Sequence, residues 1–150
     1  MKEGKDKVVA LLNKIMEAEM AGVVRYNHYA LMVFGFGRIP IVSWLRSEAD
    51  SSLLHAQEAG ELITSLGGHP SLGIGPLLET HQHDIGDILR ESLEHEAHAK
   101  ALYYELLEEV KDSSVMLEDY ARQKISEEEM HEGEVNKMLR RPGEVAAYKP

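Results

Sequence analysis

The sequence has no cysteine among its 150 residues. This absence excludes disulfide cross-links, cysteine-ligated zinc sites, iron–sulfur clusters and thiol nucleophiles. It is compatible with a reducing compartment, and we expect a cytoplasmic protein.

Long apolar runs and basic clusters are also missing. The longest apolar run, residues 29–37, is far shorter than the roughly 20 residues that span a bilayer, so we expect no membrane segment. The charged N-terminal residues lead into an amphipathic stretch with Glu17 and Glu19, which does not resemble a signal peptide. With a net charge of −10 and no basic patch, the composition argues against binding to nucleic acid.

Strand signals are nearly absent, whereas apolar residues recur every three or four positions over long stretches. This periodicity predicts four helices, at about residues 5–36, 41–66, 84–110 and 115–139. The first two and the last two are joined by short links, whereas residues 68–83 hold five glycines and prolines and predict an ordered crossing loop. We expect an all-α four-helix bundle of two antiparallel hairpins joined by a long crossover, forming one domain over residues 1–150 with a short tail at 140–150.

Polar residues interrupt the apolar stripe of every predicted helix. Glu128 and His131 point the same way on the fourth helix, because residues three apart share a face. Alone, each such residue is more often a boundary acid or a hydrogen-bonded core histidine. Buried unpaired charges cost several kcal/mol, however, and one metal centre would satisfy all of them together. The predicted ligands are Glu19, His55, Glu96, Glu128 and His131.

This pattern resembles the ferritin-like di-iron proteins, in which two helices each supply a glutamate and two supply Glu-x-x-His. The closest resemblance is to the bacterioferritins, over about residues 5–140. It includes the Leu11-Leu12-Asn13 opening and Tyr26, seven residues after Glu19. Tyr26 resembles the aromatic residue beside such sites, although a plain core tyrosine fits equally well.

The resemblance implies a di-iron centre that oxidises Fe(II) to Fe(III) with dioxygen or peroxide. It also implies iron storage or detoxification in a hollow homo-oligomer. The implied ligands form one pair for each iron and one bridge: Glu19 with His55, Glu96 with His131, and Glu128 between the two ions.

The second helix departs from the family pattern at Ser52, where the family has the acid of Glu-x-x-His. A neutral hydroxyl is a poor metal bridge, so we expect the second ion to bind weakly. Glu48 lies one turn further along the same face, about 10 Å from the level of His55. It could serve only through a local bulge, a bridging water or a transient role in iron entry.

Two further departures concern haem and assembly. Leu53 occupies the place of the haem-ligating methionine of bacterioferritins, so we expect no Met-ligated haem. The tail after Arg141 barely allows one helical turn where that family has a fifth helix, which argues against a 24-subunit shell.

Other charged residues allow a plain interpretation and a functional one. His81 and His83 suggest a solvated helix start or an ion-entry patch. His95 and His98 point off the stripe of Glu96 and suggest surface or subunit-contact residues. An acidic series on the last helix predicts a solvated face: Glu127, Glu129, Glu132 and Glu134.

Two alternative functions remain open on the sequence alone. One is a di-metal oxidase acting on peroxide or an organic substrate, which would need an apolar pocket beside the metals. The other is a non-catalytic bundle whose degenerate site holds zinc or a single iron, an interpretation that Ser52 favours.

Overall fold

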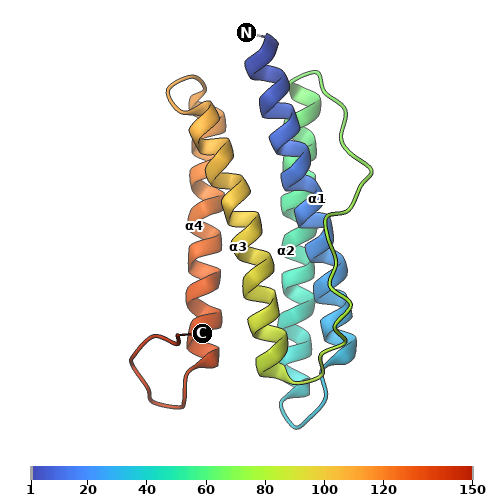
Figure 1. Ribbon diagram of the computed structural model, residues 1–150, viewed down its shortest axis with the longest axis vertical. Helices are drawn as coiled ribbons and strands as arrows, with labels where there is room; N and C mark the ends of the chain where they lie inside the picture. The colour runs from blue at the N-terminus through green and yellow to red at the C-terminus, as the bar shows by residue number, and fades with distance from the viewer. Residues whose placement is uncertain (1, 150) are drawn as a thin grey trace.

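The computed structural model describes residues 2–149, which form four long helices and no strand (Figure 1). These helices confirm the predicted all-α class and the predicted helix count. Their bounds are α1 Lys2–Met32, α2 Arg38–Ser65, α3 Ile85–Val110 and α4 Val115–Leu139.

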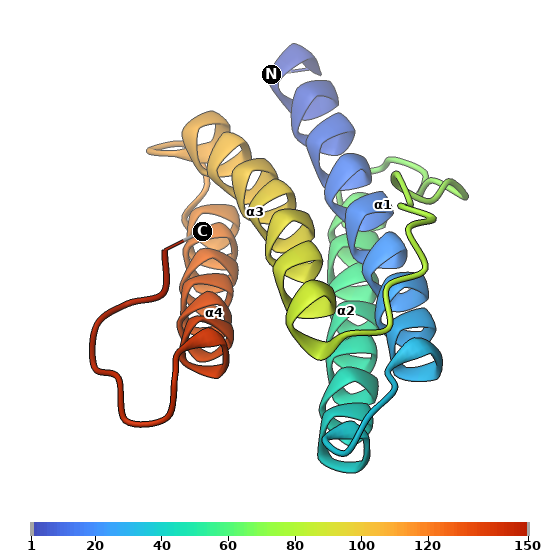
Figure 2. The same cartoon turned by 60° about the horizontal axis from the view of Figure 1, so that its bottom comes forward.

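The helices form two antiparallel hairpins, α1–α2 and α3–α4, with α1 also packed on α3. Gly35, at a φ of +116°, turns the chain between α1 and α2. The segment from Leu66 to Asp84 leaves the end of α2 and runs along α1 to the opposite end of the bundle, where α3 begins (Figures 1 and 2). This segment is the crossover.

The turn between α1 and α2 differs from the prediction, because α1 ends earlier and α2 begins before Pro40. Pro40 is the third residue of α2, where a backbone N–H has no helical acceptor, so the ring of proline is tolerated. The guanidinium of Arg38 donates to the carbonyl oxygens of Ala30 and Val33, at 2.9 and 2.8 Å. Arg38 therefore partners two carbonyl groups near the end of α1.

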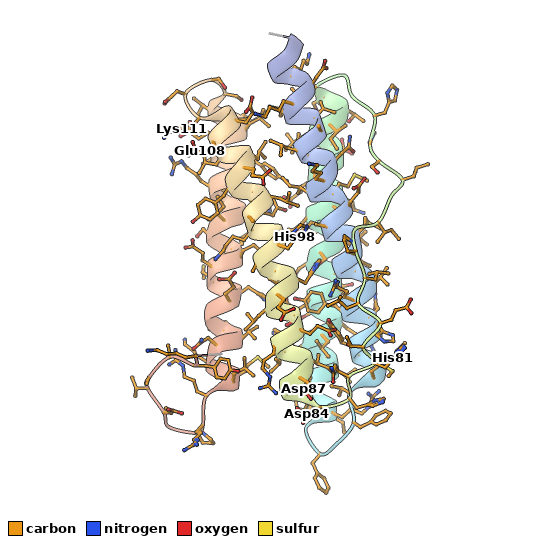
Figure 3. The ribbon with its side chains drawn as sticks, in the orientation of Figure 1. His81, Asp84, Asp87, His98, Glu108 and Lys111 are labelled. Carbon is orange, nitrogen blue, oxygen red and sulfur yellow. The ribbon has the colours of Figure 1, made fainter. Side chains whose placement is uncertain are left out.

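The second hairpin begins with capped helices. Asp84 accepts a hydrogen bond from the backbone N–H of Asp87 at 3.1 Å, and Ser114 does the same for Leu117 at 3.3 Å. Figure 3 shows Asp84 and Asp87 at this end of α3. These caps explain why the predicted starts of α3 and α4 lie within one residue of the observed ones.

The crossover is ordered by contacts with α1, as predicted. Asn13 donates to the carbonyl of His69 and accepts from the N–H of Ser71. The N–H of Gly75 donates to the carbonyl of Glu17 at 2.9 Å, and a Cβ on Gly75 would lie 3.1 Å from that oxygen. The Glu17 carboxylate, which the helical periodicity places in solvent, accepts from the hydroxyl of Ser71.

Two apolar clusters fill the bundle. One surrounds Leu12 and Leu106, and the other surrounds Val33 and Leu45. Between them lies a layer of polar side chains that includes the buried Glu19, Glu96 and Glu128 and the mostly buried His55 and His131. The bundle thus encloses polar groups near the middle of its length.

The tail folds back on α4 without forming a helix. Asn136 makes two hydrogen bonds, each of 3.0 Å, with the backbone of Tyr148. The described residues 140–149 contain turns only. Within the described part of the chain, no helix is both long enough and apolar enough to cross a bilayer.

Candidate metal centre

The five predicted ligands lie in one layer of the bundle. The side chains of Glu19, Glu96 and Glu128 are buried, and those of His55 and His131 are mostly buried. Four of the five, all except Glu19, line a cavity of about 250 Å³. Its other lining residues are Glu48, Ser51, Ser52 and Glu127.

Three of the ligands already converge. One ligand atom from each of Glu19, His55 and Glu128 lies within 4.8 Å of the others. His55 directs Nδ1 at Glu19 Oε2, 3.3 Å away, and Nε2 at Glu127 Oε2, 3.1 Å away. Metal-ligating histidines usually donate their second ring N–H to a carboxylate, so with Nε2 at Glu127 a metal at His55 would meet Nδ1.

Glu127 was missed by the sequence interpretation, which placed it on a solvated face. Its side chain is 49% exposed, but its carboxylate contacts both His55 and the buried ammonium of Lys124. Lys124 is held on its other side by Glu58, at 2.6 Å. In the sequence, Lys124 falls in the apolar stripe of α4, and a lysine in that place needs an acidic partner. The structure shows that Lys124 is buried.

His131 is held by groups from two other helices. Its Nδ1 lies 3.1 Å from Glu48 Oε2, and its Nε2 lies 3.4 Å from the hydroxyl of Tyr26. That hydroxyl donates to Glu96 Oε1 at 2.6 Å. Trp44 stacks on the imidazole, with ring centres 5.7 Å apart and planes within 2° of parallel. The ring is therefore fixed in both plane and direction.

The position of Glu48 differs from the sequence interpretation. Without any break in α2, its carboxylate reaches the cavity and contacts His131 rather than His55. The sequence interpretation considered only the distance along α2 between Glu48 and His55. It did not take α4 into account, where His131 lies level with the turn of α2 that carries Glu48.

The buried carboxyl groups of Glu96 and Glu128 interact with each other, and their pKa values move in opposite directions. Burial, and next the neighbouring Glu96, raise the pKa of Glu128 far above its ordinary value. Burial also acts to raise the pKa of Glu96, but hydrogen bonding with Glu128 and the charge of His131 lower it overall. A proton therefore resides on Glu128.

Glu128 provides the test of whether a cation fits. Among the described residues, no donor reaches its buried Oε2 atom. Buried polar atoms are nearly always partnered, and an unpartnered one calls for an explanation. Carboxylate and imidazole groups are ligands that suit divalent iron, so the donor set fits such an ion.

Ser52 is buried and faces α1 at Gly22. A Cβ on Gly22 would lie 2.7 Å from Ser52 Oγ and 3.2 Å from His95 Nε2. His95 is thus packed inside the bundle, and the expectation of a surface or subunit-contact residue is wrong for it. Burial lowers the pKa of His95 to about 4, so its ring is neutral at pH 7. His98, by contrast, is exposed about halfway along α3 (Figure 3).

The remaining candidates lie outside the cavity. His81 and His83 are exposed, and His83 stacks on Phe34 and contacts the carbonyl of Met32 at 2.8 Å. Neither belongs to the one group of described residues whose ligand atoms converge on a point. Leu53 is 40% exposed on α2, and the expected absence of Met-ligated haem remains a prediction.

Comparison with known proteins identifies relatives of this bundle. A family model for the ferritin-like domain matches residues 9–142. A search of curated proteins finds no match. Among solved structures, a ferritin-like diiron-carboxylate protein from Bacillus anthracis is 23% identical, with a TM-score of 0.87, over 93% of this chain and 100% of its own.

Two further structures are similar at the level of the fold. The dodecameric thioferritin of Bacteroides fragilis is 22% identical, with a TM-score of 0.81, over 90% of this chain and 85% of its own. The bacterioferritin of Desulfovibrio desulfuricans, described with a diiron site, is 24% identical, with a TM-score of 0.78, over 91% of this chain and 80% of its own.

Proposed function

Because this chain belongs to the ferritin-like domain family, we propose that its buried centre binds Fe(II) and oxidises it to Fe(III) for iron storage or detoxification. One observation carries the proposal. Glu19, His55 and Glu128 bring ligand atoms within 4.8 Å of one another, and the buried Oε2 of Glu128 has no hydrogen-bond donor among the described residues.

Fe(II) is the substrate, and the bundle supplies its ligands. Glu19 and His55 bind the first ion, Glu96 and His131 the second, and Glu128 lies between the two. Two Fe(II) ions each give up one electron, which reduces dioxygen to peroxide or peroxide to water with uptake of two protons. The remaining work of the protein is to hold these ligands in place and to release their protons.

Neighbouring side chains orient the ligands. Glu127 accepts from His55 Nε2, which leaves Nδ1 free for the first ion. Tyr103 donates to Glu19 Oε1 at 3.3 Å. Tyr26 contacts His131 Nε2 and donates to Glu96. The proton on Glu128 must leave when a cation binds, and the cavity gives it a route past the exposed Glu127.

Storage requires a closed assembly, so the proposal includes a homo-oligomer acting in the cytoplasm. The similar protein from Bacteroides fragilis is described as dodecameric, which supports an assembly of that kind.

A second candidate is a bundle that holds a single ion without oxidising it. It is favoured by one observation, that only the Glu19 half of the centre has converging ligand atoms among the described residues. Replacement of an acid by Ser52 points the same way.

An anaerobic Fe(II) titration followed by exposure to air separates the candidates. The proposed function predicts two Fe(II) ions per chain, then ferric absorbance that develops faster than for Fe(II) in buffer. One ion and no faster oxidation would favour the second candidate. Absence of Fe(II) binding would contradict both. Repeating the oxidation with peroxide in place of air identifies the preferred oxidant.

A further inference from the structure

Helix α2 has Ser52 where the family has an acid, but it carries an acidic residue, Glu48, one turn earlier. α2 is unbroken from Arg38 to Ser65, so residues 48 and 52 lie on the same face. Glu48 and Ser52 both line the 250 Å³ cavity, and the Glu48 side chain is only 21% exposed. The cavity therefore contains a carboxylate from α2, supplied by Glu48 instead of by position 52.

The contact between Glu48 and His131 has the spacing of two ligands on one ion. Their closest atoms, Oε2 and Nδ1, are 3.1 Å apart. Two adjacent ligand atoms of an octahedral ion with bonds of about 2.1 Å lie about 3 Å apart. The other nitrogen of His131 faces the hydroxyl of Tyr26, so Nδ1 is the nitrogen available to a metal.

Glu48 adds a further carboxylate to those of the three predicted acidic ligands. Glu19, Glu96 and Glu128 carry three negative charges when ionised, one fewer than two divalent cations need. Glu48 supplies the fourth. The nearby Lys124 lies between two further carboxylates, Glu58 and Glu127, and these three side chains together carry one net negative charge.

A simple ion pair between Glu48 and a protonated His131 explains less. It accounts for the 3.1 Å contact but leaves Glu128 Oε2 without a donor. A cation bound by Glu48, His131 and Glu128 accounts for both features. Its binding would draw their ligand atoms together, since among the described residues only those of Glu19, His55 and Glu128 lie within 4.8 Å of one another.

We propose that Glu48 is a carboxylate ligand of the second divalent cation, together with Glu96, Glu128 and His131, and replaces the acid absent at Ser52. The inference rests on the proposed function for the existence of the centre. It adds that both ions are bound and that α2 contributes to each, through His55 to the first and Glu48 to the second.

Co(II) binding tests the role of Glu48 without iron chemistry. Equilibrium dialysis counts the bound ions, and visible absorption of Co(II) reports their ligands. Wild type is expected to bind two Co(II) per chain. Loss of an outer partner typically weakens metal binding by about 10–100-fold, so loss of a direct ligand in Glu48→Gln should weaken the second ion by about 100-fold or more. The first ion should be unaffected.

Two further variants separate ligation from a structural role. Glu61→Gln removes the same charge from an exposed position of α2 and should retain both ions. Ser52→Glu in the Glu48→Gln background should restore the second ion, because it returns a carboxylate to the cavity. A positioning role for Glu48 would not be rescued in this way.

The outcomes distinguish this inference from the proposed function. Two ions of unchanged affinity in Glu48→Gln, a single ion in wild type, or failure of Ser52→Glu to rescue would each overturn the role of Glu48. Fe(II) oxidation by wild type in any of these cases would leave the proposed function standing. Absence of any Co(II) or Fe(II) binding by wild type would overturn both.

Discussion

His55 Nε2 lies 3.1 Å from Glu127 Oε2, while His55 Nδ1 faces Glu19. An acid that the helical periodicity assigns to solvent thus sets the direction of a histidine in the polar layer. In the proposed centre, this contact would give Glu127 an indirect part in metal binding, through the tautomer of His55.

Glu127→Gln should weaken the first metal ion by about 10–100-fold, because an amide holds the N–H of His55 less strongly than a carboxylate does. Calorimetric titration with Co(II) measures the change. Glu134→Gln serves as the matched control, since it removes one charge from an exposed residue of the same helix that pairs only with Lys137. Equal affinities in the two variants would show that Glu127 does not act on His55.

Metal binding should strengthen as pH rises. Burial lowers the pKa of His55, but its contact with Glu19 more than offsets this and raises the pKa overall. The same holds for His131 beside Glu48. Both rings hold protons to higher pH than free histidine, and a metal must displace them. Between about pH 5 and 8, Co(II) affinity should increase, with protons released on binding. Titration in buffers of different ionisation enthalpy measures that release. A pH-independent affinity would contradict the assignment of these two rings.

Glu128→Gln should stabilise the metal-free protein at neutral pH while removing metal binding. The folded-state pKa of Glu128 is raised, so its stabilising contribution exists at low pH and is lost as pH rises above about 4.5. An isosteric amide has no such cost, and the expected gain is about 1–2 kcal/mol. Urea unfolding across this pH range, with metal chelated, measures it. Lower stability of the variant at neutral pH would contradict the buried-proton account.

Gly22→Ala and Gly133→Ala should change stability in opposite directions. A Cβ on Gly133 meets nothing within 4 Å, so alanine should add about 0.5–1 kcal/mol through helix propensity. At Gly22 the Cβ would lie 2.7 Å from Ser52 Oγ, and crowding should cost about 1–3 kcal/mol. Urea unfolding measures both changes. Similar gains in the two variants would show that the contact between α1 and α2 at Ser52 is looser than described.

The fold was predictable because each helix carries a strong apolar period and clear end signals. Asp84 and Ser114 cap their helices as their types favour, and Gly35 turns the chain where it must. The turn near Pro40 was predicted less well, because proline is tolerated in the first turn of a helix and so did not mark the boundary.

The site was predictable only as far as helix faces determine it. Periodicity assigned the five expected ligands to inner faces, and the structure places them in one layer. Periodicity placed Glu48 on the same face as His55 but could not pair it with His131, and it assigned Glu127 to solvent. Both contacts depend on a long side chain that reaches a neighbouring helix, and the register between helices is a tertiary property. His95 was missed because the burial of its ring depends on Gly22 of another helix.

The most direct test of the central claim is the rate at which ferric absorbance appears when Fe(II) is added in air to wild type and to Glu128→Gln. Glu128 is the residue shared by both proposed ions, so its replacement should remove assisted oxidation. The account predicts fast oxidation by wild type and a rate for the variant equal to that of Fe(II) in buffer. Equal rates for wild type and variant would contradict oxidation at this centre.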